Sequence, residues 1–234
     1  MKNPIDLYLV AGNITVFCGQ HRDAFKTDLL QSSLYSHLLA AKSVSNRELV
    51  WSAYTQTLGK MAWTQNSNTY KNVDYAPNSL LNIIKSNTQH LISDSERQSL
   101  ADSFSELAKL PQDSSTLQLL LKKLRANSNN KQEINNQLTP ANKTTFNSSM
   151  IITIIRENRT IITVLVAFQT TTADELGILD GAPVQPTQDS KNNIMVWSSN
   201  LDEANYSLFR QAITEKTKRK IETELVHISS PIPD

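Results

Sequence analysis

The only cysteine of the chain, Cys18, lies three residues before His21. A thiolate nucleophile needs a base within hydrogen-bond reach, and adjacency in sequence seldom supplies that geometry. The segment from Ile14 to Cys18 is apolar and β-branched, which is typical of a strand. We therefore interpret Cys18 as a small apolar residue at the end of a strand and assign it no catalytic role.

No other pattern in the sequence predicts catalysis or metal binding. The remaining histidines are scattered, at His37, His90 and His227, without the spacing of metal ligands. Glycine-rich phosphate loops and a nucleophile elbow are missing from the sequence. Four acids fall in one long polar stretch, at Asp174, Glu175, Asp180 and Asp189, where solvated carboxylates are commoner than an acid–base pair. We expect no metal and no cofactor, and we favour a non-enzymatic protein over an enzyme that uses Cys18 or these carboxylates, an alternative that stays open.

Two groups of residues are candidates for binding. Tyr70 and Tyr75 lie in a polar stretch from Thr64 to Ala76, where exposed aromatic rings can contact a ligand or a partner. A basic run near the C-terminus could contact phosphates or an anionic surface and consists of Lys216, Lys218, Arg219 and Lys220. The alternative for the basic run is a solvated helix face with cations toward the helix C-terminus.

The overall composition excludes several classes of protein. The 23 basic and 22 acidic residues give a net charge of +1, so we expect no nucleic-acid partner. One cysteine excludes an internal disulfide framework. The longest strongly apolar stretch, Ile161 to Phe168, is far shorter than the ~20 residues of a membrane-spanning helix. Without a recognisable signal peptide, we expect a cytoplasmic protein or one exported without a cleaved signal, and the Asn, Lys and Ile bias is typical of AT-rich bacterial genomes.

The first half of the chain predicts about five helices. Apolar residues recur at helical spacing from Arg22 to Lys42. Ser45 and Ser93 each begin a capping box, while Pro77 marks a further helix start and either Asp113 or Ser114 marks another. These elements predict an N-terminal helical bundle.

A change of composition follows this helical region. Residues 126–149 contain seven asparagines and few large apolar groups, which indicates a linker or loop. We therefore divide the chain into a helical region at 1–125, this linker, and a C-terminal unit at 150–234. The C-terminal unit is predicted to hold a β-hairpin, a third strand at Asn193–Ser198 and a long helix that begins after Asn200.

The predicted hairpin is the most unusual feature. A two-residue turn at Glu157-Asn158 would place Ile155 opposite Thr160 and Ile154 opposite Ile161. Both faces of both arms are then apolar, although one face of a hairpin is normally wet. The residues proposed for self-association or membrane contact are Ile152, Ile154, Ile161, Val164 and Val166.

Three explanations of these apolar faces stay open. The hairpin can be central and covered by helices on both sides, it can meet another subunit, or it can insert into a bilayer. In the last case the two arginines near its tip would have to cross the bilayer at considerable cost.

The sequence thus predicts an α+β protein in which an N-terminal bundle joins an antiparallel three-stranded unit packed on a long helix. We expect a non-enzymatic binding or assembly protein, a homo-oligomer or the partner of another protein, that self-associates through the hairpin. The alternative is a bacterial toxin-like protein whose hairpin rearranges at a membrane surface.

Overall fold

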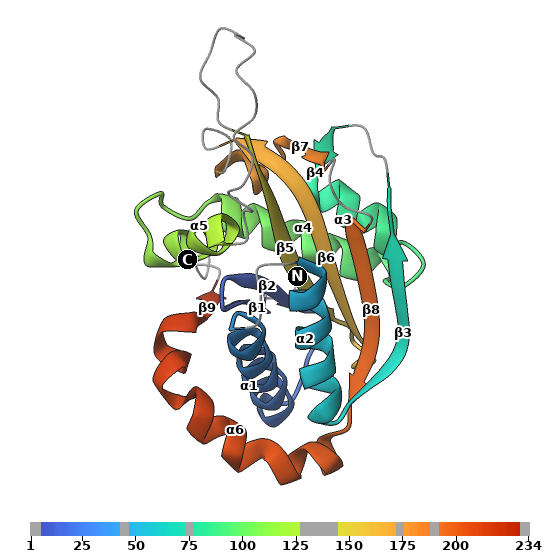
Figure 1. Ribbon diagram of the computed structural model, residues 1–234, viewed down its shortest axis with the longest axis vertical. Helices are drawn as coiled ribbons and strands as arrows, with labels where there is room; N and C mark the ends of the chain where they lie inside the picture. Colours follow the sequence, from blue (N-terminus) through green and yellow to red (C-terminus); the bar gives the residue numbers. More distant parts are fainter. Residues whose placement is uncertain are drawn as a thin grey trace, which may run out of the picture.

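The computed structural model describes residues 6–42, 47–73, 77–126, 145–171, 176–187 and 192–229. A nine-stranded mixed sheet lies at the centre of this part of the chain, with helices on both faces (Figure 1). The order of the main path is β3-β8-β6-β5-β2-β1-β9. Its strands are β1 (Asp6–Val10), β2 (Asn13–Phe17), β3 (Trp63–Lys71), β5 (Thr145–Ile155), β6 (Ile161–Thr171), β8 (Ile194–Leu201) and β9 (Leu225–Ser229), and β4 (Asn78–Ser79) and β7 (Pro183–Pro186) lie off this path.

Each face of the sheet has its own layer of three helices and its own apolar core. One layer consists of α1 (Asp23–Ala40), α2 (Arg47–Lys60) and α6 (Glu203–Glu224). The other consists of α3 (Leu80–Thr88), α4 (Asp94–Ala108) and α5 (Ser115–Ala126), and a short 3-10 helix, η1 (Leu176–Ile178), packs on the same side. The molecule is therefore a sheet between two helical layers.

The predicted bundle with a separate three-stranded unit is wrong, although six helices form where the sequence indicates them. The apolar side chains of these helices share their two cores with the strands of the sheet, although α1 also packs against α2 and α6. Strands from both halves of the chain alternate in that sheet, because β2 pairs in parallel with β5 and β3 pairs with β8. Periodicity gives the buried face of a helix but does not say whether a helix or a sheet covers it.

The strand β2 agrees with the strand predicted at Ile14–Cys18, whereas the strands β1, β3, β4, β7 and β9 were not predicted. β1 and β2 form a hairpin whose two-residue turn, Ala11-Gly12, has positive φ values of 50° and 79°, the conformation of a type I′ turn. The polar stretch after Trp63 is the strand β3, and most of its side chains are exposed. Because β3 lies at the edge of the sheet, it lacks the apolar alternation that reveals a half-buried strand.

The predicted apolar hairpin, β5–β6, is confirmed, but its register differs by one residue. Ile155 lies opposite Ile161, and Ile154 lies opposite Ile162. The turn has three residues and ends at Arg159, which has a φ of 67°, in the manner of a type I turn followed by a left-handed residue. Arginine is an uncommon choice for that conformation, so the sequence did not show the extra residue.

The hairpin occupies the middle of the sheet, between β2 and β8. Its tip is tied to two helices, since Arg156 Nε lies 3.0 Å from Glu96 of α4, and Arg159 Nη1 lies 3.2 Å from Glu203 of α6. Helices of the same chain therefore cover both apolar faces of the hairpin.

Candidate functional site

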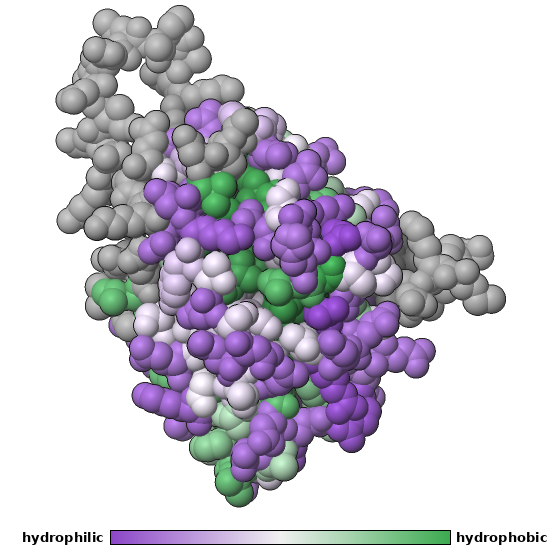
Figure 2. All heavy atoms as spheres, turned by 90° about the vertical axis from the view of Figure 1, so that its right-hand side faces the viewer, coloured by the Kyte–Doolittle hydropathy of each residue, from purple (hydrophilic) through white to green (hydrophobic). Residues whose placement is uncertain are grey.

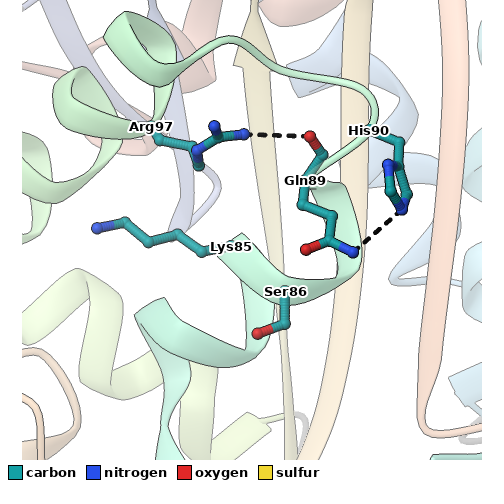
Figure 3. A pocket seen from close by; sticks show the side chains of 5 residues that line it. All are labelled: Lys85, Ser86, Gln89, His90 and Arg97. Atoms are coloured by element: carbon teal, nitrogen blue, oxygen red, sulfur yellow. Dashed lines mark hydrogen bonds between the residues drawn. The ribbon is translucent and has the colours of Figure 1, made fainter.

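A hollow in the surface lies where α3 ends and α4 begins. It has a volume of about 460 Å³ and is lined by Lys85, Ser86, Gln89, His90 and Arg97. In Figure 3 the side chains of Lys85 and Arg97 come one from each helix and extend in opposite directions. No carboxylate is among these lining residues, so the hollow is basic.

Local sequence explains how these side chains come together. Lys85 and Gln89 are four residues apart, so they lie on the same side of α3 and its C-terminal end. Ser93 then begins α4 with the predicted capping box, in which its hydroxyl accepts from the Glu96 amide and the Glu96 carboxylate accepts from the Ser93 amide. Arg97 follows one residue later and so projects from the first turns of α4 back toward α3.

Arg97 is held in place by the turn between the helices. Its Nη1 donates to the carbonyl oxygens of Gln89 at 3.1 Å and of Ile92 at 2.9 Å, and the first of these bonds is drawn in Figure 3. Its Nη2 pairs with Asp94, whose side chain is 95% exposed. An ion pair with so exposed a partner contributes little, so this guanidinium can exchange Asp94 for another anion at small cost.

Lys85 differs from Arg97 because its ammonium group has no hydrogen-bond or ion-pair partner within the described residues. Lys85 is half-buried. A nearby cation, Lys71 of β3, donates a hydrogen bond to Asn87 of α3 and does not line the hollow. A single anionic group placed in the hollow would therefore give Lys85 its missing partner and Arg97 a better one.

A second cavity, of about 350 Å³, lies between β1, α1 and the end of α6. Its charged groups are largely paired, because Asp6 lies 2.6 Å from Lys26 Nζ and 3.4 Å from His227 Nε2. Tyr8 stacks on His227, and burial together with Asp6 raises the pKa of the Tyr8 phenol to about 12. These contacts tie β1 to β9 and α1, and they leave no unpaired cation in this cavity.

Cys18 and His21 do not form a catalytic pair. The Cys18 thiol is buried, and burial together with the nearby Glu96 charge raises its pKa to about 12. His21 Nε2 forms a hydrogen bond of 2.9 Å with the carbonyl oxygen of Cys18 and not with the Cys18 sulfur. Burial lowers the pKa of the His21 ring. The part of the chain that is described also contains no group of three His, Cys, Asp or Glu side chains able to hold a metal.

The five apolar residues proposed for self-association or membrane contact are all fully buried. Ile152, Ile154, Val164 and Val166 face the α3–α5 layer, and Ile161 faces the layer of α1, α2 and α6. Their burial is explained by the helices of this chain, which was the first of the three explanations of the apolar faces.

The polar candidates are placed on two separate surfaces. Tyr70 lies on β3 and is 49% exposed, whereas Tyr75 is outside the described residues. The basic run lies on exposed turns of α6, where Lys216 Nζ is 3.1 Å from the Tyr35 hydroxyl and Lys220 is 3.8 Å from Glu224. Lys218 and Arg219 are exposed on the same helix. The structure therefore does not bring the tyrosine and the basic run together.

The acids of the long loop are outside this site as well. Asp180 is exposed near η1, and Asp174, Glu175 and Asp189 are outside the described residues.

Sequence reasoning missed Lys85 and Arg97. The capping box at Ser93 was a usable signal, because it places Arg97 one turn into a new helix shortly after Lys85. The angle between the two helices, however, depends on how both pack against the sheet.

No protein-family model, no curated protein and no solved structure matches this chain. None of the helices in the described ranges has the length and apolar character needed to cross a bilayer.

Proposed function

We propose that the chain is a non-enzymatic binding protein that holds an anionic group, a phosphate or a carboxylate, between Lys85 and Arg97. The observation that carries the proposal is the ammonium of Lys85, a residue of intermediate exposure, which has no partner among the described residues and lies in a hollow that no carboxylate lines. A bound anion would give this cation a charge-assisted hydrogen bond that the described residues do not supply.

The two cations suit an anion with several oxygen atoms. The fixed guanidinium of Arg97 can donate two parallel hydrogen bonds to a carboxylate or phosphate, while Lys85 supplies a point charge. Ser86 and Gln89 add neutral donors on the same rim. Because both cations are partly exposed, we expect weak binding that decreases as salt is added.

Titration of the protein with inorganic phosphate at constant ionic strength, followed by NMR or calorimetry, tests the proposal. Lys85→Met should weaken phosphate binding about tenfold, the loss expected when one charge-assisted hydrogen bond worth ~1.5 kcal/mol is removed. Lys85→Arg should retain most of it. Titration with acetate in place of phosphate shows whether the site prefers the tetrahedral or the planar anion.

Lys109→Met is the matched control, since it removes the same charge from the end of α4. Lys109 pairs with Glu106 at 2.8 Å and does not line the hollow, so phosphate binding should be unchanged. Equal affinity for the wild type and Lys85→Met, or no phosphate binding by the wild type, would contradict the proposal.

A further inference from the structure

The strand β3 forms one edge of the sheet and pairs only with β8 among the described strands. Its outer row of backbone donors and acceptors faces the right-hand side of the molecule in Figure 1. Figure 2 looks onto that side, where hydrophilic residues predominate and apolar ones are visible only between them. An edge strand of this kind is a ready template for another strand.

β3 carries few of the devices that normally protect such an edge. Proteins use short edge strands, charged residues, prolines or bulges for this purpose. β3 is nine residues long, and its sequence WTQNSNTYK contains no proline and no charge before Lys71. Its one protective feature is an irregularity between Gln65 and Ser67. The opposite edge, β9, has only five residues.

The sequence of β3 is compatible with a second copy of itself. In an antiparallel pair centred on Ser67, Thr64 would lie opposite Tyr70 of the other copy. Pairs of aromatic and β-branched residues favour sheet pairing. Lys71 would lie opposite Trp63, so no two lysines meet.

We infer that two copies of this chain associate through their β3 edges, as an antiparallel pair that joins the two sheets. A two-fold axis through the strand pair closes the assembly as a dimer and leaves no further β3 edge exposed. This inference does not depend on anion binding, because α3 and α4 lie outside the strand pair. A single strand pair falls at the low end of interface sizes, below about 1,200 Å², so the dimer should be weak and depend on concentration.

The test uses charge on the exposed residues Ser67 and Thr69 and follows mass by sedimentation equilibrium. The wild type should increase from monomer mass toward twice that mass as its concentration rises to the millimolar range. The variant S67K/T69K should remain a monomer, as should S67E/T69E, because each places like charges opposite each other at position 67 of the two copies and adds a second like charge nearby at position 69. An equal mixture of the two variants should recover a heterodimer.

S105K/A108K is the matched control, because it adds two lysines to exposed positions of α4 and should dimerise as the wild type does. Circular dichroism confirms that each variant is folded. A wild type that stays monomeric at millimolar concentration would overturn the inference. So would a lysine variant that dimerises normally, or a mixture that fails to associate although both variants are folded.

Discussion

Glu96 joins three segments of the chain through one carboxylate. It accepts from the Ser93 amide at 2.7 Å, from Arg156 Nε at 3.0 Å and from the Glu157 amide at 3.4 Å, and its side chain is only 4% exposed. Burial raises the pKa of this carboxyl, but the Ser93 amide and Arg156 together outweigh burial, so its pKa lies below the ordinary value. The carboxylate that completes the capping box of α4 therefore also fixes the tip of the central hairpin.

Glu96→Gln should lower the free energy of unfolding at neutral pH by about 1–3 kcal/mol, the loss expected for hydrogen bonds to a buried charge. Because the folded pKa is lowered, the contribution of Glu96 is fully present above the ordinary glutamate pKa of about 4.3. It is lost as the pH falls through the folded pKa. Urea unfolding of wild type and variant between neutral and acid pH should therefore show curves that converge in acid.

Glu106→Gln serves as the comparison, because Glu106 pairs with a Lys109 side chain that is 66% exposed. This substitution should cost no more than about 0.5 kcal/mol. A loss for Glu96→Gln that equals the loss for Glu106→Gln, or that persists unchanged in acid, would contradict the role given to Glu96.

At the scale of elements, the two faces of the sheet differ in chemistry. On the face of α1 and α2, a row of polar groups crosses the sheet in register through Thr15, Thr153, Thr163 and Trp197. The buried polar atoms without a hydrogen-bond partner in the described residues belong to Asn13, Trp51, Asn68, Trp197, Ser199 and Tyr206. All six residues contribute to this face or its helices, whereas the α3–α5 face has an apolar core. Each unpaired buried group costs about 1–3 kcal/mol.

We therefore expect the α1–α2 layer to open at lower free energy than the α4–α5 layer. Local opening follows the regions whose interactions are least satisfied. Hydrogen exchange followed by mass spectrometry should show the amides of α1 and α2 exchanging before those of α4 and α5. The opposite order would mean that ordered water satisfies these polar groups fully.

The elements also show what the sequence could predict. Helical periodicity and the Ser93 capping box placed the helices, and β-branched runs placed β5, β6 and β8. The sequence could not predict β3, whose side chains are solvated, or the pairing of β2 with β5, which joins distant segments. The same holds for the candidate site, because Lys85 and Arg97 lie on two predicted helices whose mutual angle is decided by packing on the sheet.

At the scale of the whole molecule, the two halves of the chain contribute strands to a single sheet, in which strands of one half lie beside strands of the other at more than one place. β2 from the first half lies beside β5 from the second, and β3 from the first half lies beside β8 from the second. Neither half contains a sheet that is complete without the other. The apolar side chains of both helical layers therefore need strands from both halves for their burial.

A cut between the halves tests this interdependence directly. A protease recognition sequence placed within residues 127–144 and then cleaved should give two fragments that elute together from a sizing column without denaturant. They should also unfold in one cooperative transition, because separating them would break the β2–β5 and β3–β8 pairs and expose both cores to water. The uncut chain with the same insertion is the control. Separation into two fragments that each keep native-like circular dichroism would instead support independent halves, since a helical bundle covers its own apolar stripes and needs no strands from elsewhere in the chain.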